Sequence, residues 1–156
     1  MRIGHGYDVH KLKAGDHVFL GGVKIPFDKS LIAHSDGDVL LHAVCDALLG
    51  AAGCGDIGRH FSDADPQYAG ISSRLLLVQV GQRICDEGFS ISNIDATVIC
   101  ESPKISSYKD EMVTNIAMDL KLDSSRVNIK GTTTEKLGFL GRGEGIAAVA
   151  VCLLDE

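Results

Sequence analysis

Alternating polar and apolar residues at the start of the chain predict a β-strand. If the stretch RIGHGYDVH, residues 2–10, is extended, successive side chains point to opposite faces of a sheet. One face would carry Gly4, Gly6, Asp8 and His10, and the other Ile3, Tyr7 and Val9. The first face is small or charged, which fits either the solvated side of an edge strand or part of a metal site.

Apolar residues at helical spacing predict three helices along the rest of the chain. Ser35 and Asp38 form a candidate capping pair before the first of them. The helices are expected within residues 39–49, closed by Gly50 or Gly53, within 72–87, closed by Gly88, and within 107–120.

Shorter β-branched runs predict further strands. The doublet Gly21-Gly22 between two such runs indicates a hairpin, and Pro26 marks its end. Other strands are expected at residues 94–100, within 126–135 and at 145–154, and a long loop at 54–73. The last strand is apolar on both faces, which is typical when helices cover one side and a partner or second layer the other. The pattern predicts one α+β domain over residues 1–156, a four-stranded mixed β-sheet with helices packed mainly on one face.

Composition and charge narrow the class of protein. The 156 residues are 45% apolar and 23% charged, which is enough for one hydrophobic core. A net charge of −6 argues against a nucleic-acid partner and an anionic membrane surface. We expect a cytoplasmic protein, because no leader pattern or membrane-length apolar run occurs. An odd number of cysteines without C-x-x-C spacing favours reduced core thiols at Cys45, Cys54, Cys85, Cys100 and Cys152.

Two histidines and an aspartate suggest a metal site. Asp8 and His10, two residues apart on a strand, can reach one point in space. His42 lies among apolar residues of the first helix, with Asp38 and Asp46 one turn away on the same face as candidates to orient its ring. Three such ligands with an open fourth position describe a catalytic zinc site. The alternative is a core histidine satisfied by one hydrogen bond.

Residues before the first helix favour an anion. The segment AHSDGD, residues 33–38, places free backbone N–H groups and the positive end of the helix dipole together. His34 and Ser35 would add side-chain donors to a phosphate. The alternative is ordinary N-capping by Ser35 or Asp36.

The segment KGTTTEKLGFLGRGEG, residues 130–145, concentrates hydroxyls, charges and glycines. It lacks the spacing of a P-loop. A loose G-x-G-x-x-A at Gly143 leads into a strand, whereas a dinucleotide fold needs a helix there. The threonines could hold phosphate oxygens, and Glu135 a second cation such as Mg²⁺. A solvated Gly-rich hairpin remains the alternative.

Three motifs together resemble a known family. GHGYDVH, AHSDGDVLLHAVCDALLGAAGCGDIGRHFSDADP and TTTEKLGFLGRGEGI are similar to those of the 2-C-methyl-D-erythritol 2,4-cyclodiphosphate synthases of the non-mevalonate isoprenoid pathway, and they span nearly the whole chain. The resemblance implies a lyase acting as a homotrimer with active sites between subunits. In the implied reaction, the 2-phosphate of 4-diphosphocytidyl-2-C-methyl-D-erythritol 2-phosphate attacks the β-phosphorus, the cyclodiphosphate closes and CMP leaves.

The resemblance also implies roles for individual residues. It makes Asp8, His10 and His42 the Zn²⁺ ligands, His34 and Thr133 the groups that steady the transition state, and Ser35 a phosphate contact. The methylerythritol would meet Asp56, Ile57, Gly58 and a lid of Phe61, Ser62, Asp63, Ala64 and Asp65. The CMP moiety would meet Cys100, Glu101, Ser102, Pro103, Lys104, Ile105, Ser106, Thr132, Thr133, Thr134 and Glu135 of the adjacent subunit. Glu135 would help to bind Mg²⁺ or Mn²⁺, and Phe139 and Arg142 would lie near a cavity on the three-fold axis that takes isoprenoid diphosphates.

The segment CESPK departs from the family pattern, in which Ala-Gln tends to precede this Pro-Lys. Glu101 therefore adds a negative charge near the nucleotide.

Two other functions compete with the synthase. Two histidines and a carboxylate are also the facial triad of non-haem Fe(II) oxygenases. A non-catalytic isoprenoid-phosphate sensor that uses the Arg142 region is the second.

Overall fold

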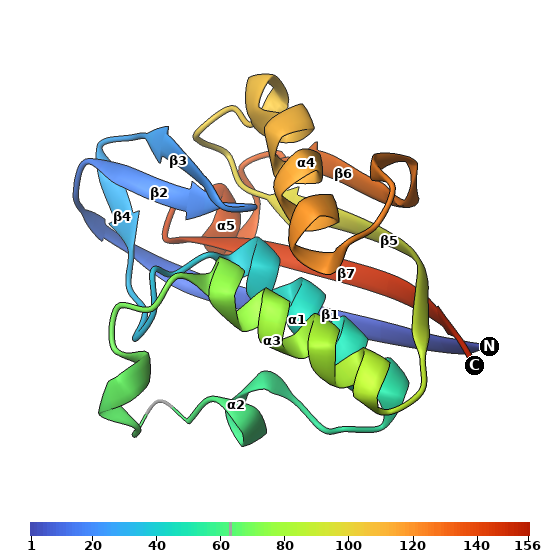
Figure 1. The fold of residues 1–156 in the computed structure, drawn as a ribbon. Helices are drawn as coiled ribbons and strands as arrows, with labels where there is room; N and C mark the ends of the chain where they lie inside the picture. The colour runs from blue at the N-terminus through green and yellow to red at the C-terminus, as the bar shows by residue number, and fades with distance from the viewer. Residues whose placement is uncertain (63) are drawn as a thin grey trace.

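The structure, a computed structural model, describes residues 1–62 and 64–156. Its strands are β1 Arg2–Ala14, β2 His17–Leu20, β3 Val23–Pro26, β4 Lys29–Leu31, β5 Ser90–Ile99, β6 Val127–Thr132 and β7 Gly145–Asp155. Its helices are α1 Val39–Ala52, α2 Ile57–His60, α3 Ser73–Asp86, α4 Lys109–Leu120 and α5 Gly138–Gly141, with 3-10 turns at Pro66–Tyr68, Ser106–Tyr108 and Ser124–Arg126. Figure 1 shows their arrangement.

The main sheet has five strands in the order β4-β1-β7-β5-β6, so the prediction of four strands is wrong. β5 and β6 run parallel, and the other neighbours run antiparallel. The missed strand is β4, which pairs only with the end of β1. Its three residues are too few to show an alternating pattern in the sequence. The predicted hairpin is confirmed: β2 and β3 pair by themselves around Gly21 and Gly22, whose φ angles are 59° and 73°.

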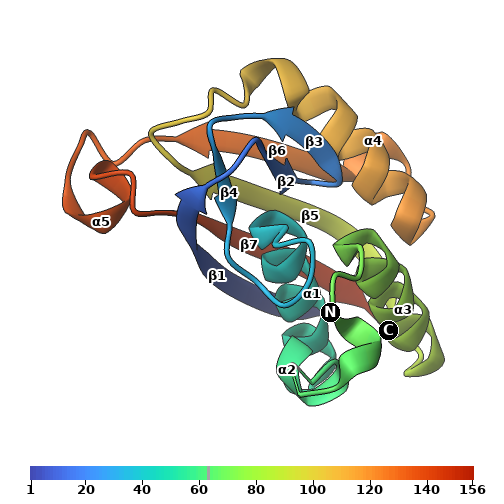
Figure 2. The same ribbon diagram turned by 90° about the vertical axis from the view of Figure 1, so that its left-hand side faces the viewer.

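Three helices cover one face of this sheet, as predicted. α1 packs on β1 and β7, α3 packs on α1, and α4 packs on α3 and β6. Figure 2 shows the sheet from a second direction, with α1, α3 and α4 on the same side of it. The α+β class is therefore confirmed, with one hydrophobic core between the sheet and the helix layer.

Two glycines let α1 lie directly against β1. A Cβ at Gly4 would come 1.9 Å from the carbonyl oxygen of Ala47, and one at Gly6 would come 1.9 Å from the carbonyl oxygen of Ala43. No side chain fits there, so only glycine allows this approach. The close contact brings His42, the neighbour of Ala43, beside the strand.

The first turn of α1 is anchored by one buried carboxylate. Asp38 is the N-cap and accepts from the N–H of Leu41, and it also accepts from Gly21 and Gly22 of the hairpin. Burial raises the pKa of Asp38. The expected capping role of Ser35 is wrong, because its hydroxyl instead accepts from the N–H of Gly37.

The opposite face of β1 and β7 carries exposed apolar side chains. We call it the outer sheet face and define it by four residues: Ile3, Tyr7, Val9 and Val151 are 73%, 48%, 38% and 36% exposed. His5 also lies on this side and is exposed, away from Asp8. Within the chain, no helix covers the described residues of this face (Figure 2).

The prediction of reduced core thiols is confirmed for the oxidation state of the cysteines and only partly for their burial. All five are free thiols. Cys45, Cys100 and Cys152 are buried, Cys54 is half-buried, and Cys85 is exposed on α3, so it is no core residue. Among the described residues, no helix has the length and apolar content needed to cross a membrane.

Candidate active site and metal centre

Three potential metal ligands meet where β1 lies against α1. The carboxylate Oδ2 of Asp8 lies 2.9 Å from Nε2 of His10 and 3.0 Å from Nδ1 of His42. The two ring nitrogens lie 3.0 Å from each other. These three form the one cluster of potential metal ligands among the described residues.

The donor set fits zinc. Two imidazole nitrogens and one carboxylate oxygen are ligands that Zn²⁺ accepts at about 2.0–2.2 Å, which spaces tetrahedral ligands about 3.3–3.6 Å apart. The observed separations of 2.9–3.0 Å are shorter, so the three ligand atoms need to move apart by only a fraction of an ångström to hold the ion. Because the chain brings three ligands, a fourth position would be left for a substrate oxygen.

The ligands also influence one another's protonation. Burial would raise the pKa of Asp8, but hydrogen bonds and positive charge from His10 and His42 outweigh it and lower that pKa well below the usual range. Burial would lower the pKa of His42, yet the hydrogen bond to Asp8 and nearby carboxylates raise it. The site therefore holds a negative Asp8 that attracts cations.

A pocket of about 370 Å³ opens at the metal ligands. Of the residues expected to bind substrate phosphates and methylerythritol, it is lined by Asp8, His10, His34, Ser35, Ile57, Gly58 and Phe61, and His42 lines it too. The ring of His34 lies 3.4 Å from the carbonyl oxygen of Asp65. The pocket thus gathers the proposed metal ligands and phosphate donors.

Other predicted sugar contacts lie outside the lining of this pocket. Asp56 is exposed and caps α2 by accepting from the N–H of Arg59. Ser62 accepts from the N–H of Ala64, and Asp65 accepts from Gln67. Asp63 falls outside the described residues.

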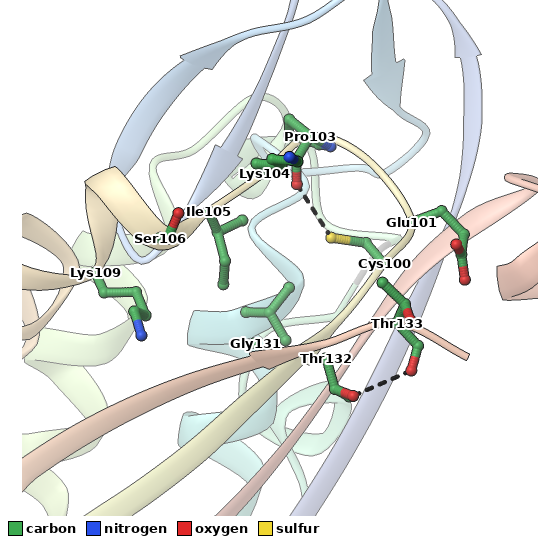
Figure 3. A pocket seen from close by; sticks show the side chains of 11 residues that line it. Cys100, Glu101, Pro103, Lys104, Ile105, Ser106, Lys109, Gly131, Thr132 and Thr133 are labelled. Atoms are coloured by element: carbon green, nitrogen blue, oxygen red, sulfur yellow. Dashed lines mark hydrogen bonds between the residues drawn. The ribbon is translucent and has the colours of Figure 1, made fainter. Parts of the chain in front are cut away.

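A second pocket, of about 290 Å³, lies at the C-terminal ends of β5 and β6. Of the residues expected to bind CMP, it is lined by Cys100, Glu101, Pro103, Lys104, Ile105, Ser106, Thr132 and Thr133. Figure 3 shows Glu101 and Thr133 on one side of it and Ile105, Ser106 and Lys109 on the other. Ser102, Thr134 and Glu135 do not line it. Lys109 was not predicted from the sequence.

The unusual Glu101 organises the threonine turn. Its Oε1 accepts from the backbone N–H of Thr134 at 3.0 Å and from that of Lys136 at 3.2 Å, while the Thr134 hydroxyl donates to the carbonyl oxygen of Leu137 at 2.7 Å. Glu135 and Lys136 have positive φ angles of 53° and 63°, which are unfavourable for residues other than glycine. The carboxylate thus supports a turn with a strained backbone.

The remaining predicted residues lie near α5. Glu135 is exposed, and Thr133 Oγ1 accepts from its N–H. Phe139 borders a pocket with Val9, whereas Arg142 pairs with Glu144 and does not line that pocket. The expected place of Phe139 and Arg142 near a cavity on a three-fold axis involves other copies of the chain and stays a prediction.

The sequence profile of the YgbB family matches residues 1–155. The chain belongs to the YgbB family. The resemblance seen in the motifs is confirmed by two relatives, each named 2-C-methyl-D-erythritol 2,4-cyclodiphosphate synthase. The one from Desulfatibacillum aliphaticivorans is 59% identical over 99% of this chain and 100% of its own length. The one from Thioalkalivibrio sulfidiphilus is 57% identical over 100% of this chain and 98% of its own length.

Solved structures share the fold of this YgbB family member. The IspF protein of Plasmodium falciparum in complex with CDP has a TM-score of 0.86 and 38% identity, over 98% of this chain and 94% of its own. The bifunctional IspDF protein of Campylobacter jejuni has a TM-score of 0.94 and 46% identity over 98% of this chain. This chain spans only 42% of the length of that bifunctional protein.

Sequence reasoning placed the wrong partners behind His42 in this YgbB family chain. Asp38 caps α1, and Asp46 accepts from the N–H of Ile57 at 2.8 Å, so neither orients the ring. The outer nitrogen Nε2 instead lies 2.9 Å from Oγ of Ser73 and 3.1 Å from Oγ of Ser35. No periodicity connects Ser73 with His42, because they lie on different helices.

Proposed function

We propose that this chain converts 4-diphosphocytidyl-2-C-methyl-D-erythritol 2-phosphate into 2-C-methyl-D-erythritol 2,4-cyclodiphosphate and CMP. The observation that carries the proposal is the convergence of Asp8, His10 and His42 in a pocket that also holds His34 and Ser35. Full-length identity of 59% to a synthase of that name supports it. Phosphoryl transfer within one molecule needs positioning and charge neutralisation more than a covalent nucleophile.

Asp8, His10 and His42 would hold a zinc ion, one per chain. A bound zinc ion supplies Lewis-acid polarisation of a phosphoryl oxygen. The chain's own contribution is geometric: β1 and α1 hold the three ligand atoms within 3.0 Å of one another, so little rearrangement is needed on binding. The identity of the bound metal distinguishes the two functions, because the synthase would hold zinc and the alternative Fe(II) oxygenase would hold iron.

The groups around the metal ligands would orient the substrate. His34 and Thr133 would stabilise charge on the transferring phosphoryl group, and Ser35 would donate to a phosphate oxygen. Ile57 and Gly58, with Asp56 and the segment from Phe61 to Asp65, would bind the methylerythritol. Excluding water around these groups would favour attack by the substrate's own phosphate over hydrolysis.

The second pocket would take the CMP moiety. A CDP complex of the related Plasmodium falciparum protein supports a cytidine-linked ligand for the family. Residues 100–106 would contact the nucleotide, with Lys104 at the phosphates, and Thr132 to Glu135 would flank the diphosphate. Glu135 would help to bind Mg²⁺ or Mn²⁺ together with substrate phosphates, which such ions favour over closed protein cages.

A homotrimer would combine the two pockets. The metal pocket is built on β1, α1 and α2, and the nucleotide pocket on β5 and β6; among the described residues they share no lining residue. The outer sheet face would bury its apolar side chains against neighbouring copies. A cavity beside Phe139 and Arg142 for isoprenoid diphosphates and a cytoplasmic location stay predictions.

Metal analysis with a turnover assay tests the proposal. Purified protein should contain zinc at one per chain and should release CMP from the substrate when Mg²⁺ is added. Stoichiometric iron would favour the oxygenase. Zinc without any CMP release would leave only the binding-module alternative.

A further inference from the structure

We infer that Asp36 and Ser73 are positioning residues that fix the tautomer of His42 as a metal ligand, with its proton on Nε2 and its Nδ1 lone pair directed at the metal position beside Asp8 and His10. The inference rests on the metal site proposed above. His42 Nε2 lies 2.9 Å from Oγ of Ser73, and that hydroxyl lies 2.5 Å from Oδ1 of Asp36. The three groups form a continuous chain from the metal centre to a carboxylate.

The proton positions follow from what each group can donate. An ionised carboxylate only accepts hydrogen bonds, so the hydroxyl proton of Ser73 is donated to Asp36. The oxygen of Ser73 then faces His42 with a lone pair, and it accepts from an N–H at Nε2. A neutral imidazole with its proton on Nε2 has an unprotonated Nδ1. That nitrogen is the one that lies 3.0 Å from both Asp8 and His10.

Packing keeps Ser73 in this orientation. Ser73 is 0% exposed at the start of α3, and its backbone N–H also donates to Oδ2 of Asp36 at 3.0 Å. Asp36 therefore holds both donors of the same residue. The hydroxyl oxygen of Ser35 lies 3.1 Å from Nε2; one of its lone pairs accepts from the N–H of Gly37, which leaves the other for an N–H at Nε2.

Asp36 is not replaceable by an amide in this arrangement. Its oxygens face three donors: the N–H and O–H of Ser73 and the N–H of Asp38. An asparagine would place its NH₂ against one of them. If the NH₂ faced the hydroxyl, Ser73 would turn its proton toward His42 and favour the tautomer with Nε2 unprotonated.

Zinc affinity of the full-length protein tests the inference, measured by competition with a chromogenic chelator. Ser73→Ala and Asp36→Asn should each weaken zinc binding about 10- to 100-fold, the usual effect of removing an outer partner of a histidine ligand. Ser73→Thr keeps the hydroxyl and should restore affinity. Ser72→Ala is the matched control, because Ser72 is exposed and makes no side-chain capping bond.

A second measurement separates positioning from a general loss of structure. In the zinc-loaded protein, the Nε2 proton of His42 should exchange slowly with water in the wild type and in Ser72→Ala, and faster in Ser73→Ala. If Ser73→Ala does not fold, the zinc affinities of Asp36→Asn and Ser73→Thr test the inference instead. Zinc affinities of Ser73→Ala and Asp36→Asn within twofold of the wild type would overturn the inference while leaving the metal site intact. A wild type that binds no zinc would overturn the metal site as well.

Discussion

His42 has a polar partner on each ring nitrogen, which decides between the two interpretations of this residue. Nδ1 faces Asp8 and His10, and Nε2 faces Ser35 and Ser73. A core histidine satisfied by one hydrogen bond is therefore wrong. A ring held on both sides in a pocket loses little freedom when a metal binds, which favours affinity.

Replacing His42 by alanine should remove zinc and activity together. The variant leaves two ligands, so zinc should fall from one per chain to near zero. CMP release should fall roughly 10³-fold, since a metal contributes several kcal/mol to charge stabilisation and each 1.4 kcal/mol is tenfold. Metal analysis and CMP assays check this, and light scattering should still find the proposed trimer.

His17→Ala is the control for that experiment. His17 lies on β2, outside both pockets, where its ring contacts Asp16 and Phe19. It should keep zinc and turnover. Full CMP release by a zinc-free His42→Ala protein would contradict the metal assignment.

At the scale of elements, the contact between β1 and α1 sets the distance from Asp8 to His42. Gly6→Ala should push the helix away, because its Cβ would lie 1.9 Å from the carbonyl oxygen of Ala43. We expect a loss of about 1–3 kcal/mol in the free energy of unfolding, with weaker zinc binding. Thermal melting and the chelator competition measure the two effects.

Gly50→Ala serves as the matched variant in the same helix. Gly50 is exposed on α1, and nothing lies within 4 Å of its would-be Cβ. Alanine there should be neutral or stabilising by about 0.5–1 kcal/mol. Equal melting temperatures for Gly6→Ala and the wild type would show that the close approach does not constrain the site.

Glu101 offers a test of the link between the nucleotide loop and the threonine turn. Both backbone donors, the N–H groups of Thr134 and Lys136, meet one oxygen, Oε1, which the carbonyl oxygen of glutamine can replace. Glu101→Gln should therefore keep kcat/KM within about threefold, whereas Glu101→Ala should lower it roughly 5- to 30-fold by leaving the turn without its acceptor, at about 1–2 kcal/mol. Equal losses in both variants would mean that the charge, and not the turn, matters.

Periodic segments were predictable from the sequence, and contacts between distant segments were not. The helices at Val39–Ala52 and Ser73–Asp86 differ from the predicted ranges by a few residues at most. Their apolar spacing and glycine ends are local signals. β4 was missed because it has three residues and takes its position from β1.

The site shows the same division. Asp8, His10 and His42 were identified from residue type and motif, and they converge in the structure. Ser73 was missed, because the meeting of α3 with α1 is a tertiary contact that leaves no mark on local spacing. Asp36 was considered only as a cap, although its oxygens hold Ser73.

At the scale of the whole molecule, the outer sheet face should form the contact between copies. Val151→Asp should dissociate the proposed trimer and lower CMP release, because it would bury an unpaired charge. Val78→Asp on α3 is the control. Val78 is 42% exposed and Val151 is 36% exposed, but Val78 lies on the helix side of the sheet, away from the outer sheet face. Light scattering measures both. A trimeric and fully active Val151→Asp protein would contradict this interface.

Oxygen-18 labelling tests the central claim most directly. The protein is incubated with 4-diphosphocytidyl-2-C-methyl-D-erythritol 2-phosphate and Mg²⁺ in ¹⁸O-enriched water. The ¹⁸O content of each product is then measured by mass spectrometry. The account predicts equal amounts of CMP and cyclic diphosphate without ¹⁸O in either, because the substrate's own phosphate attacks. Incorporation of ¹⁸O into an open diphosphate would show hydrolysis, and this result or the absence of CMP would contradict the account.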